Sequence, residues 1–143
     1  AAGRIGVGIG ALGVAERALE EAVRYSKERV QFGKPISSFQ AVQHMLAEIA
    51  TEIEAARLLL YKAAWLKDQG LPFEKFASMG KYYASEVAMK ATVKAVQIFG
   101  GYGYTTDYPV ERLLRQAKLF EIIEGTTEIQ KNIIASRILK EYR

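Results

Sequence analysis

The chain has 143 residues, half of them hydrophobic, which is enough for one domain with a substantial core. With no cysteine and a single histidine, it excludes a disulfide framework, a cysteine nucleophile and a histidine-rich or thiolate metal centre, so we expect no metal. The formal net charge is +4, with both signs mixed along the chain, which favours a solvated surface with a modest preference for anions. The longest apolar run, Ile5 to Ala15, is too short to cross a bilayer, and we expect no membrane association.

Apolar residues recur every three or four positions from Ile5 to about Val30, which predicts a helix. Its first half is rich in glycine and alanine, so another backbone or a flat ligand can approach it closely. Gly8, Gly10 and Gly13 spell the dinucleotide fingerprint G-x-G-x-x-G, but no strand precedes them, and we reject a Rossmann site. The chain does not begin with Met, so we expect a fragment or a processed product.

Glycine and proline separate the later segments, and Ser37 or Ser38 is expected to cap the second helix. Pro109 suits the first position of a short helix, where its missing N–H costs nothing. The expected helices after the first are Phe39 to Gln69, Phe73 to Phe99, a short one from Pro109, and a last one from Thr126 or Thr127 to about Lys140. The sequence therefore predicts one all-α domain over 1–143, an antiparallel four-helix bundle with a short additional helix before the last one.

Glu124 is the candidate catalytic residue. Gly125 follows it without a side chain to obstruct a ligand, and the unpaired N–H groups of the helix that begins near Thr126 favour an anion. We expect Ile122 and Ile123 to bury the carboxyl and raise its pKa, as a base for a weakly acidic carbon requires, and we expect it near the 97–101 turn. The alternative is that Glu124 merely precedes a helix, and the residues alone do not separate the two.

Other polar and aromatic residues have simpler interpretations. Arg112 and Arg115 are interpreted as partners of Glu111, Glu121 or a helix end, whereas Arg29 lies at a helix end where it can reach a diphosphate. His44 and the aromatic positions around Tyr82 and Tyr83 are interpreted as packing or surface residues.

Several motifs occur in order along nearly the whole chain: Gly3-Arg4-Ile5-Gly6, Arg29 to Pro35, Phe39-Gln40, Gln97 to Gly101, Tyr108 to Arg112 and Ile123 to Thr126. Together they resemble the C-terminal helical domain of the acyl-CoA dehydrogenases, closest to the short-chain and short/branched-chain members. The resemblance implies oxidation of acyl-CoA to trans-2-enoyl-CoA with FAD, with electrons passed to electron-transfer flavoprotein. It also implies a homodimer or homotetramer, in the cytoplasm of a bacterium or the mitochondrial matrix of a eukaryote.

The resemblance assigns roles residue by residue. Glu124 takes the α-proton while a hydride goes to the flavin, and its N–H helps to hold the thioester carbonyl. Gly125 and Arg4 match substrate contacts. The residues that match FAD contacts are Thr126, Thr127 and Glu128 in the same subunit, and Arg29, Phe32, Gln40, Gln97, Ile98, Phe99, Gly100 and Gly101 towards a neighbouring subunit.

The sequence also departs from the family pattern. Gln116 replaces an aspartate, Ile123 replaces a common aromatic residue, and Ala1-Ala2 replace an acidic residue before Gly3-Arg4. The N-terminal helical and middle β domains have no counterpart in these 143 residues, so we expect the isolated chain to be inactive.

Two other function classes were weighed. A non-catalytic helical oligomerisation module shares the same fold. A nucleic-acid binder rests only on the net charge, because the lysines and arginines are scattered and no helix-turn-helix spacing is evident, so no nucleic-acid partner is predicted.

Overall fold

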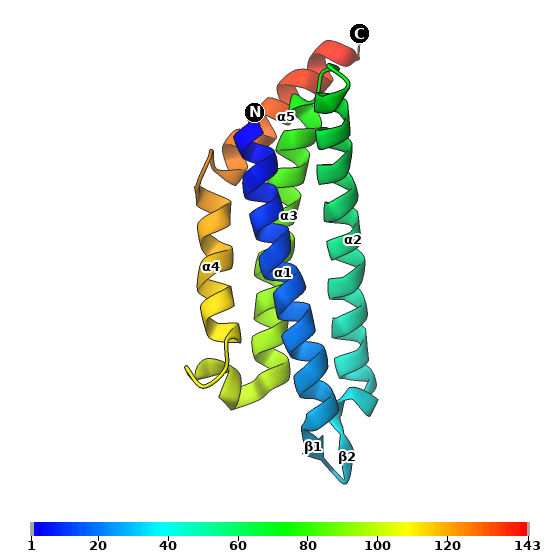
Figure 1. Cartoon of the computed structure of the whole chain (residues 1–143), viewed down its shortest axis with the longest axis vertical. Helices are drawn as coiled ribbons and strands as arrows, with labels where there is room; N and C mark the ends of the chain where they lie inside the picture. The colour runs from blue at the N-terminus through cyan, green and yellow to red at the C-terminus, as the bar shows by residue number, and fades with distance from the viewer. Residues whose placement is uncertain (1, 143) are drawn as a thin grey trace.

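The computed structural model describes residues 2–142 and is almost entirely helical (Figure 1). The α-helices are α1 (Ala2–Glu28), α2 (Gln40–Asp68), α3 (Glu74–Phe99), α4 (Val110–Ile122) and α5 (Thr127–Glu141). Short 3₁₀ turns, η1 (Ile36–Ser38) and η2 (Gly100–Tyr104), precede α2 and follow α3. The predicted all-α class is confirmed, and the predicted helices correspond to the observed ones.

Helices α1 to α4 run side by side with alternating direction, and α3 contacts each of the other three (Figure 1). The fourth position, beside α1 and α3, is taken by the short helix α4 rather than by the last helix. Helix α5 packs against α3 and lies across one end of the bundle. The chain therefore returns along part of the bundle through the 13 residues of α4 before it reaches Glu124.

The core between α1 and α3 is built largely from alanine. Buried alanines recur along both helices, and their small side chains allow the two backbones to approach closely. These residues are Ala11, Ala15, Ala18 and Ala22 on α1 and Ala84, Ala88, Ala91 and Ala95 on α3. A Cβ on Gly8 would lie 2.4 Å from Leu60 Cδ2, and one on Gly10 would lie 2.8 Å from Phe120 Cε1. Gly8 and Gly10 thus serve close packing, whereas a Cβ on Gly6 or Gly13 would meet nothing within 4 Å.

Two details of the first connection differ from expectation. A two-stranded antiparallel hairpin, β1 (Val30–Gln31) and β2 (Lys34–Pro35), joins α1 to η1, with Phe32 and Gly33 at its tip in left-handed conformations. The predicted serine cap of α2 is wrong, because Phe39 is the N-cap and Ser38 Oγ donates instead to Pro35 O at 2.6 Å. Ser37 and Ser38 belong to η1 and lie two residues and one residue before the N-cap position of α2.

None of the described helices is long and apolar enough to cross a membrane.

Candidate active site

The predicted site residues lie at two ends of the bundle. Glu124 to Glu128 join α4 to α5 beside the start of α1, whereas Arg29 and residues 97–101 lie at the opposite end (Figure 1). The 13 residues of α4 separate the two places by roughly 20 Å of helix. The expectation that Glu124 lies near the 97–101 turn is therefore wrong for a single chain.

The turn after α4 has an unusual backbone. Glu124 has φ 56° and Gly125 has φ 91°, so two consecutive residues are left-handed. Such a conformation costs roughly 1–2 kcal/mol for a non-glycine residue and persists only where surrounding contacts enforce it. The side chain of Glu124 is thus held in a direction that an ordinary helix end would not give it.

Two buried side chains enforce this turn from inside the bundle. Lys81 on α3 donates from Nζ to Gly125 O at 2.7 Å, and Gln130 on α5 donates from Nε2 to the carbonyl oxygens of Glu124 and Gly125, both at 3.2 Å. Both Lys81 and Gln130 have 0% exposed area. Burial lowers the pKa of Lys81, and the negative charge of Glu121 partly opposes this shift. Hydrogen bonds to the carbonyl groups of Glu124 and Gly125 therefore connect the turn to α3 and α5.

The carboxylate of Glu124 lies over the first turn of α1. A Cβ built on Gly3 would stand 3.0 Å from Glu124 Oε2. Contrary to the prediction of a buried carboxyl, Glu124 is exposed, and Ile122 is itself 54% exposed. Apolar neighbours in sequence do not enclose a side chain when no other element of the chain covers them.

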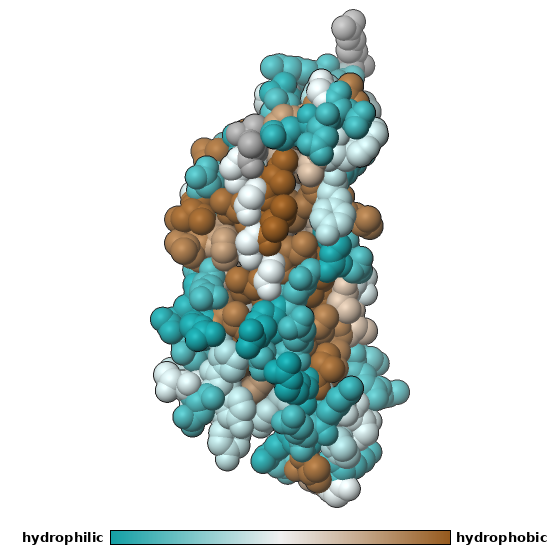
Figure 2. All heavy atoms as spheres, viewed as in Figure 1, coloured by the Kyte–Doolittle hydropathy of each residue, from teal (hydrophilic) through white to brown (hydrophobic). Residues whose placement is uncertain are grey.

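The surface around this turn is nevertheless apolar. Ile9 on α1 and Leu119 and Ile122 on α4 are each about half exposed, at 48%, 52% and 54%. Figure 2 shows hydrophobic atoms gathered on this part of the visible face, over the end of α4 and the first half of α1. A partner group that covered this surface would therefore remove water from the carboxylate.

The start of α5 matches the predicted anion-favouring helix end. Thr126 is the N-cap, and its side chain accepts from Ile129 N at 3.4 Å. Thr126, Thr127 and Glu128 line one shallow depression together with Lys118 and Lys131. The carboxylates of Glu86 and Glu121 line it as well, and Glu121 pairs with Lys118 at 3.0 Å, so the depression has no excess of positive charge. The free N–H groups of the first helical turn suit a polar ligand edge.

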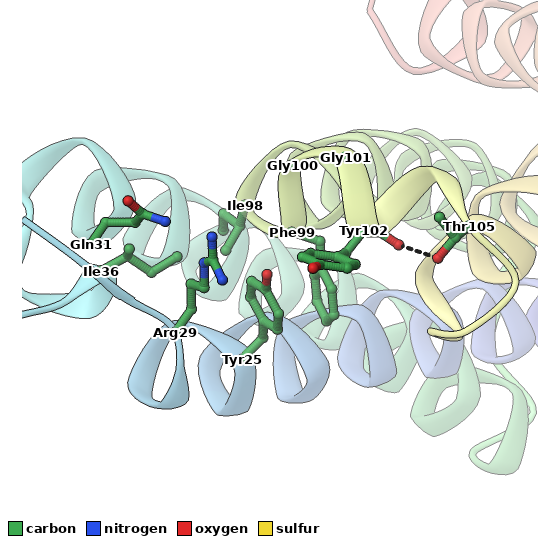
Figure 3. A pocket seen from close by; sticks show the side chains of 10 residues that line it. All are labelled: Tyr25, Arg29, Gln31, Ile36, Ile98, Phe99, Gly100, Gly101, Tyr102 and Thr105. Atoms are coloured by element: carbon green, nitrogen blue, oxygen red, sulfur yellow. Dashed lines mark hydrogen bonds between the residues drawn. The ribbon is translucent and has the colours of Figure 1, made fainter.

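At the other end, Arg29 and the end of α3 share a pocket of about 500 Å³. Figure 3 shows Arg29 and Tyr25 extending towards Ile98 and Phe99, below the glycine turn. The lining residues are Tyr25, Arg29, Gln31, Ile36, Ile98, Phe99, Gly100, Gly101, Tyr102 and Thr105. An apolar wall, a guanidinium and bare glycine backbone together suit part of a nucleotide cofactor.

Stacked aromatic rings form the floor of this pocket. The rings of Tyr25 and Phe99 lie parallel at 4.1 Å, and Tyr108 contacts Phe99 edge-on at 5.1 Å. Burial raises the pKa of Tyr25, partly offset by the charge of Arg29. The hydroxyl of Tyr25 therefore adds no negative charge to this pocket at neutral pH.

Comparison with known proteins identifies the family of the chain. The family described as acyl-CoA dehydrogenase, C-terminal domain, matches residues 1–139. The chain belongs to the acyl-CoA dehydrogenase family. The predicted resemblance is thereby confirmed.

Its relatives in this family include short-chain and short/branched-chain enzymes. The chain is 54% identical over 138 residues to a short-chain-specific acyl-CoA dehydrogenase of Clostridium acetobutylicum, covering 96% of this chain and 36% of that protein. It is 54% identical over 140 residues to the mitochondrial short/branched-chain-specific acyl-CoA dehydrogenase of Rattus norvegicus, covering 98% and 32%. The structure of butyryl-CoA dehydrogenase from Megasphaera elsdenii matches with a TM-score of 0.95 and 54% identity, over 96% of this chain and 36% of that one. The chain thus spans about a third of the length of these acyl-CoA dehydrogenases.

Not every residue matched to a family role lines one of these depressions. Of the set assigned to FAD, Phe32 is 91% exposed at the hairpin tip, and Gln40 and Gln97 are exposed outside the Arg29 pocket. Arg4 lies on the first turn of α1, one residue after the glycine that the Glu124 carboxylate contacts. Arg115 pairs with Glu111 at 3.0 Å, as the simpler interpretation predicts. In residues 2–142, no cluster of three or more potential metal ligands is present.

Lys81 and Gln130 are functional candidates that sequence reasoning missed. Each lies inside a regular helix, where a lysine or glutamine is ordinarily solvated. No sequence signal separated either residue from a surface residue. In the structure, a Cβ on the neighbouring Gly80 would lie 2.7 Å from Leu60 Cδ2, which shows how closely α3 packs against α2 at this point.

Proposed function

We propose that the chain is the C-terminal catalytic domain of an FAD-dependent acyl-CoA dehydrogenase that oxidises short or branched acyl-CoA to trans-2-enoyl-CoA. Glu124 is the base that removes the α-proton of the acyl thioester. The observation that carries the proposal is the strained turn, in which a left-handed glutamate precedes a left-handed glycine and is fastened by buried donors. A turn that served only to connect α4 to α5 would need no strained glutamate.

The proposed cofactor is FAD, on which members of the family depend. FAD supplies the acceptor for the hydride that leaves the β-carbon. The residues present fit it in two places: Thr126 to Glu128 offer N–H groups and hydroxyls to one flavin, and Arg29 with residues 98–101 offers charge and open backbone to the FAD of a neighbouring subunit. The separation of the two places by the length of α4 supports this division between subunits.

Proton abstraction from a thioester requires that Glu124 lose water when substrate binds. In this chain the carboxylate is exposed beside an apolar surface that includes Ile9, Leu119 and Ile122. We therefore propose that domains corresponding to the rest of the relatives' length cover this surface and that the 143-residue chain alone is inactive. Gly125, followed by the start of α5, leaves room for the thioester beside the base. Arg4, on the first turn of α1 next to Gly3, is the proposed contact to the acyl-CoA.

The proposed partners follow the same reasoning. They are an acyl-CoA, electron-transfer flavoprotein as electron acceptor and further copies of the subunit in a homodimer or homotetramer, in bacterial cytoplasm or the mitochondrial matrix. A purely structural oligomerisation module is the second candidate, favoured by exposed aromatic residues such as Tyr61 and Trp65 on α2. The two candidates differ in whether activity depends on Glu124.

The test uses a hybrid enzyme in which this chain replaces the matching segment of the Megasphaera elsdenii butyryl-CoA dehydrogenase. The hybrid is expected to bind FAD, assemble and oxidise butyryl-CoA. Glu124→Gln should abolish turnover while FAD binding and assembly remain, and Glu20→Gln, at an exposed position of α1, is the matched control. Unchanged turnover in Glu124→Gln would leave only the structural module.

The isolated chain provides the complementary test. Mixed with FAD and butyryl-CoA, it is expected to cause no bleaching of flavin absorbance. Efficient bleaching would contradict the proposal that other domains complete the site.

A further inference from the structure

Lys81 is a buried lysine whose ammonium group has one hydrogen-bond acceptor among residues 2–142. Its side chain has 0% exposed area, and its Nζ donates to Gly125 O at 2.7 Å, a length typical of a charge-assisted bond. Within residues 2–142, no carboxylate oxygen lies within 4.0 Å of this ammonium group. An ammonium group has three N–H donors, so burial here costs more than a single carbonyl bond returns.

The fold does not need this lysine to satisfy the turn. Gln130 Nε2 already donates to both Glu124 O and Gly125 O, so neither carbonyl would be orphaned without Lys81. An apolar side chain of similar length would fill the same space without a desolvation cost. The charge at position 81 therefore calls for an explanation other than stability.

The direction of the carbonyl groups provides one. Because a trans peptide is planar, its N–H points opposite to its C=O. The carbonyls of Glu124 and Gly125 face Gln130 and Lys81 inside the bundle, so the N–H groups of Gly125 and Thr126 face away from it. In the described part of the chain these two N–H groups have no hydrogen-bond partner. The donors at positions 81 and 130 thus fix which side of the turn is presented outward.

We propose that Lys81 is a positioning residue for Glu124: by holding the Gly125 carbonyl inside the bundle, it keeps Glu124 in its left-handed conformation, with the carboxylate over Gly3 and the N–H groups of Gly125 and Thr126 turned outward. The inference rests on the proposed role of Glu124 as the base. In this proposal, Lys81 on α3, 44 positions from Gly125 in the sequence, determines the orientation of the Glu124 carboxylate towards the substrate.

The first experiment needs no activity. In the 143-residue chain, Lys81→Met is expected to change the amide chemical shifts of residues 124–127 and to increase their motion, while the melting temperature stays within about 4 °C. Lys90→Met, on the exposed side of the same helix, is the matched control and should leave these amides unchanged. Unchanged amides at 124–127 in Lys81→Met would overturn the proposal.

The second experiment uses the hybrid enzyme with butyryl-CoA. Lys81→Met should lower kcat roughly 10- to 100-fold with little change in KM, since misplacement of a base by about 1 Å has effects of this size. The primary isotope effect with α-deuterated butyryl-CoA should rise, because proton abstraction becomes more fully rate-limiting. Lys81→Gln, which keeps an N–H donor, should recover part of kcat.

The outcomes separate the two proposals. If the hybrid with the natural residues fails to oxidise butyryl-CoA, the proposed function fails, and the amide measurement still decides whether Lys81 holds the turn. If Lys81→Met and Lys81→Gln both unfold the chain, or if both keep full kcat and the same isotope effect, Lys81 is not a positioning residue.

Discussion

The carboxylate of Glu124 lies against the backbone of Gly3, where a Cβ would stand only 3.0 Å from Oε2. Two residues separated by almost the whole chain therefore meet at the candidate base. Because Gly3 also begins the motif that includes Arg4, this contact joins the start of α1 to the turn before α5. The conformation of the carboxylate depends on the missing side chain at position 3.

A branched side chain at position 3 should displace the base. Gly3→Val is expected to push the carboxylate away from α1 and lower kcat of the hybrid enzyme roughly tenfold or more, with the fold intact because position 3 is exposed. Gly6→Val is the matched control, since a Cβ there meets nothing within 4 Å. Equal kcat values for the two variants, measured with butyryl-CoA, would show that the contact has no effect on catalysis.

The packing glycines of α1 should differ in their effects on stability. A Cβ at position 8 would already lie 2.4 Å from Leu60 Cδ2, and the methyl groups of a valine would come closer still. Gly8→Val should therefore lower the free energy of unfolding by about 1–3 kcal/mol or more. Gly13→Ala, at an exposed position with nothing within 4 Å, should instead raise it by about 0.5–1 kcal/mol through helix propensity. Urea unfolding of the 143-residue chain measures both. Destabilisation by Gly13→Ala would contradict the helix-propensity argument.

The helices could be predicted because their signals are local. Apolar periodicity and the punctuation by glycine and proline placed α2 and α3 within a residue of their observed bounds. The hairpin at Phe32 and Gly33 was missed because strands of two residues have no periodicity to detect. The sequence did not predict that α4, and not α5, packs beside α1 and α3 as the fourth helix of the bundle. That choice depends on side-chain packing, which helix length alone does not specify.

The sequence predicted the residues of the turn at Glu124, but not the distant residues that hold this turn in place. Glu124, Gly125 and Thr126 were visible as a glutamate and a glycine before a helix, and the predicted start of that helix at Thr126 or Thr127 is confirmed. The contact from Lys81 to Gly125 spans 44 positions, and nothing near Lys81 in the sequence distinguishes it from a surface lysine. Exposure of Glu124 was mispredicted because Ile122 and Ile123 are neighbours in sequence but do not cover the carboxylate.

Removal of the strain at Glu124 should separate stability from activity. Glycine adopts a positive φ without the steric cost that a Cβ imposes, so Glu124→Gly should exceed Glu124→Ala in free energy of unfolding by about 1 kcal/mol. Both variants lose the carboxylate, so both hybrid enzymes should be inactive. Urea unfolding of the two chains checks the first part. Equal stabilities would mean that the left-handed conformation at position 124 carries no strain.

The buried ammonium of Lys81 should make stability depend on alkaline pH. In the folded chain, burial lowers the pKa of Lys81 below its ordinary value of 10.5, and the charge of Glu121 on α4 partly opposes this shift. At a pH between the folded and unfolded pKa values, the unfolded chain therefore binds more protons than the folded chain. The free energy of unfolding of the natural chain, relative to Lys81→Met, should therefore rise as pH increases towards 10.5, where the cost of the buried charge is relieved. Tyr25, whose raised pKa acts in the opposite sense at high pH, is present in both chains and cancels in the difference. Urea unfolding of both chains at about pH 7 and about pH 10 measures this difference, and a constant value would show that Lys81 titrates alike in the folded and unfolded chain.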